Sequence, residues 1–168
     1  GKLMIFSKFL NATNWHKRPY TEILDEVREI TDYLDQNSNF RQVWLSEHHL
    51  QTTNNWTMEC IPNPILLGSD LAARTKNIRI GLAAAIATFW NPLRLAEDVA
   101  LLDNLSSGRL DVGLGRGVFG KEAIHIPTNS SQTNIFASFS AAIVFLYKYN
   151  PKKKLVRTKR TYATRIKM

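Results

Sequence analysis

Short apolar runs alternate along the chain with longer segments in which apolar residues recur every three to four positions. The apolar runs lie at residues 2–10, 42–46, 78–87 and 109–114. Their hydrophobicity is typical of buried strands, and the spacing in the segments between them predicts helices. Because strand and helix alternate strictly with short connections, the pattern predicts an α/β fold in which helices cover a parallel sheet.

Capping residues mark where the three predicted helices begin. Thr21 is the expected N-cap of the first helix. Pro64 suits the first position of the second helix, because a proline lacks only an N–H group that has no partner there. Asn91-Pro92 combines a capping side chain with such a proline and opens the third helix.

The net charge of +8 is carried by the end of the chain. Residues 151–168 hold eight basic residues and no acidic one, whereas residues 1–150 hold 14 of each sign. We expect this basic tail to be irregular or disordered, and residues 123–150 to contain at most one further helix. A basic tail attracts any polyanion by counterion release, with a steep salt dependence. Polyanion binding is therefore a distant alternative function, and no specific nucleic-acid site is expected.

The sequence shows neither a membrane segment nor an export signal. No apolar run approaches the roughly 18 to 20 residues that cross a bilayer, and the N-terminus lacks the features of a signal peptide. Cys60 is the single cysteine, so it can form neither an internal disulfide nor a cysteine metal knuckle. No histidine spacing typical of zinc recurs. The expected location is the cytoplasm, with no membrane partner and no metal.

Glu47-His48-His49, at the end of the second predicted strand, is the first candidate for chemistry. Active sites of parallel α/β sheets assemble at the carboxyl edge of the strands. Histidine titrates near neutral pH and can act as a general base, while a neighbouring carboxylate can orient its ring. Adjacent residues of an extended chain point to opposite sides, so we expect one histidine to face the pocket. A histidine hydrogen-bonded only for structure is an equally weighted alternative.

Two further segments suit a flat, phosphorylated ligand. Residues 115–120 match G-x-G-x-x-G, but three strands precede them and no clear helix follows, so we reject a dinucleotide fingerprint. Glycines still let the backbone approach an anion, and Arg116 can grip a phosphate with its guanidinium fork. The small residues 83–85 leave room for something flat. The alternatives are a tight turn with a surface ion pair and simple filling of the fold's interior.

Several motifs occur in an order and spacing that match a known family. Residues 43–50, VWLSEHHL, are similar to the motif W-L-x-E-H-H-F. Residues 91–109 are similar to H-P-x-R-x-A-E-x-x-x-x-L-D-x-L-S-x-G-R, and the next strand leads into a G-x-G-R-G turn. Over residues 2–122 the chain thus resembles the bacterial-luciferase-like flavin-dependent monooxygenases.

The resemblance implies a (β/α)8 TIM barrel, of which residues 1–122 form about the first four βα units. A complete barrel needs about 250 residues, so we expect the activity to belong to a full-length parent and this fragment alone to be inactive. The resemblance further implies reduced FMN from a flavin reductase, or the deazaflavin coenzyme F420, with O2 oxidising an organic substrate such as an aldehyde. It also implies a homo- or heterodimer. A non-catalytic flavin-binding protein of the same fold is the alternative.

The resemblance also assigns roles to polar residues. His48 corresponds to the catalytic base, and Glu47 supports it at the pocket edge. Arg116 matches the arginine that contacts the flavin phosphate, and the backbone near Val118 is expected beside that phosphate.

Small residues receive roles as well. Ala83 and Ala84 match the residues under the isoalloxazine ring, where several members have a non-prolyl cis peptide, so we expect a cis bond between them. Gly115 stands where the light-emitting luciferase subunit has a reactive cysteine, so the resemblance does not imply light emission.

Overall fold

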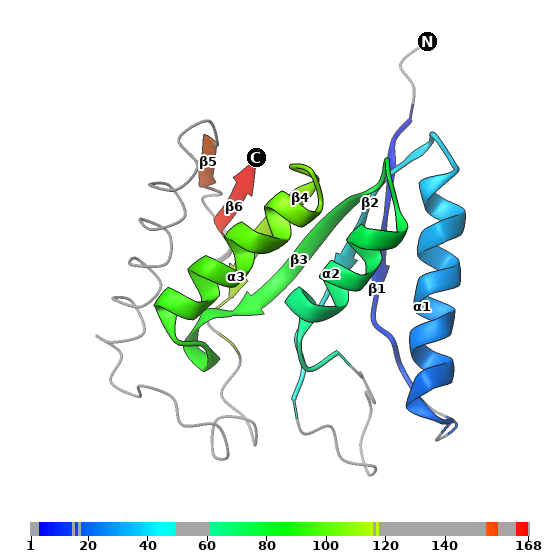
Figure 1. Cartoon of the computed structure of the whole chain (residues 1–168), viewed down its shortest axis with the longest axis horizontal. Helices are drawn as coiled ribbons and strands as arrows, with labels where there is room; N and C mark the ends of the chain where they lie inside the picture. Colours follow the sequence, from blue (N-terminus) through cyan, green and yellow to red (C-terminus); the bar gives the residue numbers. More distant parts are fainter. Residues whose placement is uncertain are drawn as a thin grey trace.

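Four parallel strands alternate with helices, and the candidate site residues predicted from the sequence lie at or near the ends of these strands (Figure 1). The computed structural model describes residues 4–14, 16, 18–49, 61–115, 117, 154–157 and 164–167. In chain order the elements are β1 (Phe6–Leu10), α1 (Tyr20–Asp35), β2 (Phe40–Leu45), α2 (Pro64–Arg74), β3 (Arg79–Ile86), the 3-10 turn η1 (Ala87–Phe89), α3 (Pro92–Leu105), β4 (Leu110–Gly115), β5 (Lys154–Arg157) and β6 (Thr164–Lys167).

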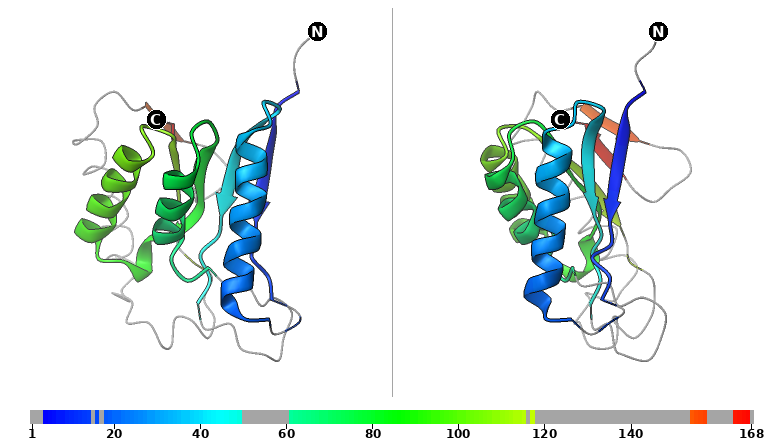
Figure 2. Two further views of the ribbon diagram at one scale, coloured as in Figure 1. Left: turned by 45° about the vertical axis from the view of Figure 1, so that its right-hand side comes forward. Right: turned by 90° about the vertical axis from the view of Figure 1, so that its right-hand side faces the viewer.

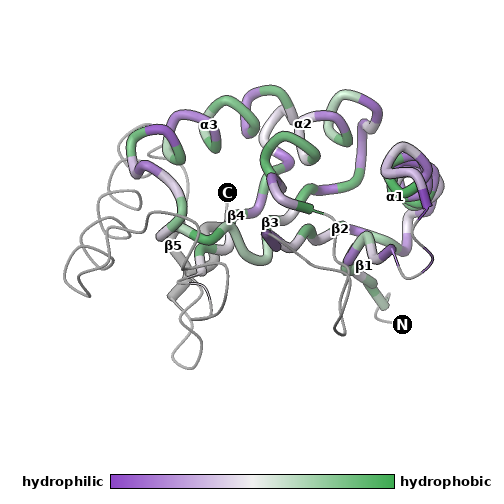
Figure 3. Tube along the Cα trace, turned by 90° about the horizontal axis from the view of Figure 1, so that it is seen from below, coloured by the Kyte–Doolittle hydropathy of each residue, from purple (hydrophilic) through white to green (hydrophobic). Residues whose placement is uncertain are grey.

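The sheet has the strand order β1-β2-β3-β4-β6-β5, and its first four strands pair in parallel. All three helices lie on one face of these strands, as Figures 2 and 3 show. Each helix returns the chain to the start of the next parallel strand, which is the arrangement of a barrel wall with its helices outside. The predicted α/β fold with successive βα units is confirmed.

The core lies between the helices and the sheet. Leu45, Ile80 and Leu82 are fully buried there, and burying such a side chain stabilises the fold by about 1.5–3 kcal/mol. A Cβ added to Gly68 of α2 would lie 3.2 Å from both Ile80 Cγ2 and Leu102 Cδ2. The missing side chain therefore lets α2 approach the sheet closely.

The predicted starts of the second and third helices are confirmed. Asn63, directly before Pro64, accepts a hydrogen bond from the amide of Leu66 with its side chain. The Asn91 side chain likewise accepts hydrogen bonds from the amides of Leu93 and Arg94. Each asparagine therefore satisfies N–H groups that have no partner within the helix. No helix of the described part of the chain is long and apolar enough to cross a membrane.

The predicted start of the first helix is wrong. Thr21 lies inside α1, which begins at Tyr20 with Pro19 in the N-cap position and no capping side chain. The Pro19 carbonyl accepts the amide of Glu22 at 3.0 Å. The fixed φ of proline favours this boundary, because proline is tolerated only at the beginning of a helix. The proline signal thus outweighed the hydroxyl of the next threonine.

Asp35, at the end of α1, organises the connection between α2 and β3. Its carboxylate accepts the amides of Lys76, Asn77 and Ile78 at 2.7–3.2 Å. Burial alone raises the pKa of this carboxyl, but these amide hydrogen bonds outweigh burial and lower its pKa below the usual value. The ionised carboxylate therefore ties α1 to the amino edge of the sheet, opposite the predicted site.

The basic tail contributes two strands beside β4. β6 pairs antiparallel with β4, and β5 pairs antiparallel with β6. The expectation of an irregular or disordered tail is wrong for residues 154–157 and 164–167. An edge strand leaves a row of N–H and C=O groups unpaired, and an extended segment can pair with them whatever its charge. The helix expected within residues 123–150 lies outside the described residues.

Candidate active site

Glu47 lies just beyond β2 with a fully buried side chain. Its Oε2 accepts the Ile86 amide at 2.7 Å, and both carboxylate oxygens lie 3.0–3.1 Å from the indole Nε1 of Trp90. Its Oε1 lies 2.7 Å from Nε2 of His49. One carboxylate therefore joins the ends of β2 and β3 to Trp90, the residue before the N-cap of α3.

Burial raises the pKa of the Glu47 carboxyl, and the hydrogen bonds from His49, Ile86 and Trp90 oppose this rise without cancelling it. A carboxyl with a raised pKa takes up a proton more readily than an exposed one. Perturbed groups of this kind are concentrated at functional sites, although structural ion pairs share the property.

The two histidines have different surroundings. The ring of His49 is half-buried and meets Phe89 edge-on, with ring centroids 5.4 Å apart. His48 is half-buried, and its backbone amide donates to the Ile61 carbonyl at 3.0 Å. The sequence prediction paired Glu47 with His48, whereas in the structure the Glu47 carboxylate contacts His49. Side chains two residues apart in an extended segment share a side, which brings 47 and 49 together.

Ala83 and Ala84 form an irregularity in β3. Their peptide bond is cis, as the resemblance led us to expect. The register with β4 shifts between Leu82 and Ala85. Opposite this irregularity, a Cβ on Gly113 would lie 2.7 Å from the Leu82 carbonyl oxygen, and one on Gly115 would lie 3.1 Å from Ala84 Cβ. Two glycines of β4 therefore make room for the path of β3.

Gly117, just after β4, packs against the end of β3. Gly117 has φ +82°, and a Cβ there would lie 2.8 Å from Ile86 Cγ2. Glycine is required on both counts, since other residues adopt this φ at a cost and would clash. Arg116 and Val118 lie outside the described residues. The structure thus brings together the Glu47 segment, the two alanines and Gly117.

The family model for luciferase-like monooxygenases matches residues 4–130. The chain belongs to this family. The oxygenase component of the flavin-dependent trigonelline monooxygenase of Acinetobacter baylyi is 38% identical over 101 residues, which are 60% of this chain and 26% of that protein. An alkanal monooxygenase alpha chain of Photorhabdus laumondii is 30% identical over 119 residues, 71% of this chain and 32% of that protein.

Solved structures show the same fold. The oxygenating constituent of 3,6-diketocamphane monooxygenase from Pseudomonas putida, in complex with FMN, superimposes with a TM-score of 0.74 at 20% identity over 99% of this chain and 44% of its own. Monooxygenase RslO1 of Streptomyces bottropensis gives 0.72 at 24% identity, over 98% and 48%. This luciferase-like chain therefore spans less than half of either structure and about a quarter to a third of the curated relatives.

The small residues of this luciferase-like site fit a flat ring. Ala83 and Ala84 carry one methyl group each and are half-buried, and Gly115 beside Ala84 carries none. Larger side chains at these positions would fill the space beside the strand ends. The described residues of the site are thus compatible with a flavin ring, and the predicted roles of the individual residues stay predictions.

Sequence reasoning did not find Trp90 or the Ile86 amide, which both contact Glu47. A signal for Trp90 was present, because a tryptophan stands directly before the Asn91 cap. The indole N–H of a tryptophan shielded from water usually finds an acceptor, and the neighbouring predicted strand, residues 42–46, is followed directly by an acid. No local pattern identifies the Ile86 amide, since its partner lies 39 residues earlier.

Proposed function

We propose that the chain forms the N-terminal half of a flavin-dependent monooxygenase, which binds reduced FMN at the carboxyl edge of β2–β4 and uses O2 to oxidise an organic substrate. The observation that carries the proposal is the meeting of Glu47, the Ala83–Ala84 segment and the turn at Gly117 at this edge, in a member of the family. Ligands of parallel α/β folds bind at this edge of the sheet.

Each group has a proposed task. When bound, the reduced flavin supplies the reaction with oxygen, while the protein provides binding, orientation and exclusion of water. Ala83 and Ala84 lie under the flavin ring. Arg116 and the backbone at Val118 hold its phosphate, and His48 acts as the base that moves a proton at the pocket.

The names of relatives support an oxygenase that acts on a small organic molecule. One relative is a trigonelline monooxygenase and another an alkanal monooxygenase. FMN is favoured over coenzyme F420, because a solved neighbour contains FMN and relatives are named as flavin-dependent. An F420-dependent secondary alcohol dehydrogenase of similar fold, with a TM-score of 0.61 at 16% identity, keeps F420 as the second candidate.

FMN titration followed by flavin fluorescence tests the proposed site. We expect Ala83→Leu to weaken FMN binding by about tenfold or more, equivalent to about 1.4 kcal/mol, because the larger side chain occupies the space of the ring. Ala73→Leu, the same change on the exposed surface of α2, is the control and should leave the affinity unchanged. Equal affinities of the two variants for FMN, or no FMN binding by the unsubstituted chain, would contradict the proposal.

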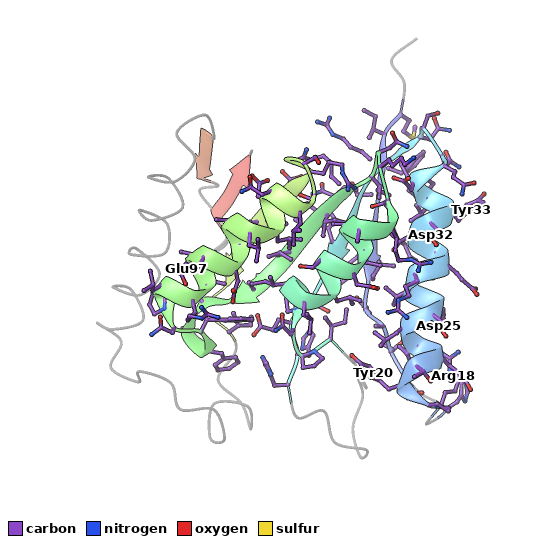
Figure 4. The ribbon with its side chains drawn as sticks, viewed as in Figure 1. Arg18, Tyr20, Asp25, Asp32, Tyr33 and Glu97 are labelled. Carbon is purple, nitrogen blue, oxygen red and sulfur yellow. The ribbon has the colours of Figure 1, made fainter. Side chains whose placement is uncertain are left out.

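We also infer that the parent enzyme is a dimer served by a flavin reductase. Relatives are named as alpha and beta chains and as an oxygenase component. Leu93, Leu101 and Leu105 on α3 are 51%, 59% and 56% exposed, and Leu66 on α2 is 70% exposed. Figure 4 labels Glu97 on α3, the helix that carries three of these leucines. The leucines offer an apolar surface for a second luciferase-like chain.

Sedimentation of the chain tests the proposed dimer surface. We expect the mass of a dimer for the unsubstituted chain and the mass of a monomer for Leu101→Lys, because a lysine ammonium group buried at the interface would lose its hydration. The control is Tyr33→Lys on α1, a residue that is 68% exposed on another helix, which should stay dimeric. A parent chain that sediments as a monomer at micromolar concentration would refute the surface.

A further inference from the structure

His49, Trp90 and the amide of Ile86 surround the buried Glu47 carboxylate, and we call this group the Glu47 clasp. We propose that Glu47 and Trp90 are positioning residues, which fix the Ala83–Ala84 segment of β3 relative to the two histidines. The proposal rests on the proposed flavin site and adds a task that the family resemblance does not assign to Trp90. The backbone pairing of β2 and β3 ends before this segment.

Backbone hydrogen bonds join β2 to β3 only as far as the pair Leu45 and Leu82. Beyond Leu82 the register with β4 shifts, and it resumes at Ala85. The end of β3 therefore has no regular ladder to β2 at the level of Ala83 and Ala84. The Glu47 carboxylate crosses this gap and accepts the Ile86 amide at 2.7 Å, so a side chain replaces the missing backbone pairing.

The clasp lies close in sequence to the residues that it would position. Ile86 comes two residues after Ala84, and His48 follows Glu47 directly. Because consecutive Cα atoms are about 3.8 Å apart, fixing Ile86 against Glu47 also restricts how far Ala84 and His48 can move relative to each other. A misplacement of about 1 Å at a reacting centre can cost about a hundredfold in rate.

Trp90 fixes the carboxylate itself. Its indole Nε1 lies 3.0 Å from Oε1 and 3.1 Å from Oε2 of Glu47, so one N–H group faces both oxygens. Trp90 also directly precedes Asn91, the N-cap of α3. The clasp thus fastens β2, β3 and the start of α3 at one buried point, and without the indole N–H the carboxylate loses one of the groups that hold its orientation.

A carboxylate suits this position better than an amide would. The Ile86 amide and the Trp90 indole are both donors, and His49 can donate through Nε2. A glutamine would present one acceptor oxygen and a competing NH2 group to these donors. Hydrogen bonds to an ionised acceptor are also stronger than those to a neutral one. Glu47→Gln should therefore weaken the clasp while keeping the size of the side chain.

Trp90→Phe tests the proposal, because it keeps an aromatic ring and removes the indole N–H. We expect hydrogen exchange at the Ile86 amide to accelerate about tenfold or more, and FMN binding to weaken about tenfold. Glu47→Gln should change both quantities in the same direction. Val99→Ala is the control, since it truncates a buried residue of α3 that takes no part in the clasp. It should lower the melting temperature without a selective change at Ile86.

The comparison of the clasp variants with Val99→Ala separates a positioning role from a general loss of stability. If Trp90→Phe and Val99→Ala bind FMN equally well, or if Ile86 exchange is unchanged in both clasp variants, the positioning role is refuted. If the parent chain itself does not bind FMN, the proposed flavin site fails and the positioning role fails with it. The two failures are distinguishable. The positioning role alone is refuted when the unsubstituted chain binds FMN and Trp90→Phe binds it as well as Val99→Ala does, or when hydrogen exchange at the Ile86 amide is unchanged in both clasp variants.

Discussion

Gly81→Val is expected to lower the free energy of unfolding by about 3 kcal/mol. Gly81 lies in the buried part of β3, where the ring of Trp44 from β2 covers its Cα. A Cβ at this position would lie 2.6 Å from Trp44 Cδ2 and 2.7 Å from Cζ3, much closer than carbon atoms approach in packed interiors. Valine adds two further methyl groups, so either the indole or the strand must move. Urea unfolding followed by circular dichroism measures the loss.

Two further variants separate this clash from a general intolerance of larger residues. Gly68→Ala places a methyl group 3.2 Å from side-chain carbons of Ile80 and Leu102, and it also gains about 1 kcal/mol of helix propensity. Its stability should therefore stay within about 1 kcal/mol of the parent. In the background of Trp44→Leu, which removes the indole, Gly81→Val should lower the free energy of unfolding by less than it does in the unsubstituted chain. Additive losses in that double variant would contradict the contact.

Local patterns were sufficient to predict most of the parallel part of the fold. The strand runs and the helical spacing identified β1–β4 and the helices between them, and Asn63 and Asn91 capped the helices expected of them. These signals are contained within a few neighbouring residues, which is why one sequence is enough to read them. At Pro19 two local signals competed, and the restricted φ of proline determined the start of α1.

The parts that the sequence did not predict depend on partners far along the chain. Glu47 was identified as a candidate from its motif, but the Ile86 amide and the Trp90 indole lie 39 and 43 residues later. The strands of the tail depend on the free edge of β4, about which the residues 154–167 carry no local information. Alternation along an extended segment could have assigned His49 rather than His48 to the Glu47 carboxylate.

Two groups of buried polar side chains lie at opposite edges of the sheet. At the amino edge, Asp111 accepts hydrogen bonds from Gln42 at 2.5 Å and from Arg79 at 2.8 and 3.1 Å. Asp35 and Arg109 bind backbone groups near the same edge. The Glu47 clasp is at the carboxyl edge. In barrels of this class the amino edge serves stability and the carboxyl edge function, so substitutions at the two edges should have different consequences.

Arg109→Lys is expected to lower the free energy of unfolding by about 3 kcal/mol without a selective effect on the flavin site. The Arg109 guanidinium donates to the carbonyls of Ala72, Thr75, Ile78 and Ser106 at 2.7–3.0 Å, and to the Thr75 hydroxyl at 2.9 Å. A lysine offers three donors from one atom and cannot reach these acceptors together. Chemical denaturation of the purified variant measures the loss.

A second arginine provides the control for this prediction. Arg94 forms an exposed ion pair with Glu97 at 3.3 Å, with the two side chains 68% and 48% exposed. Arg94→Lys should therefore change stability by no more than about 0.5 kcal/mol. Burial lowers the pKa of Arg109 while the charge of Asp35 opposes that shift, so the lysine would also be a less favourable cation in this position. A loss at Arg109 no larger than that at Arg94 would show that the loop between α2 and β3 does not depend on the guanidinium.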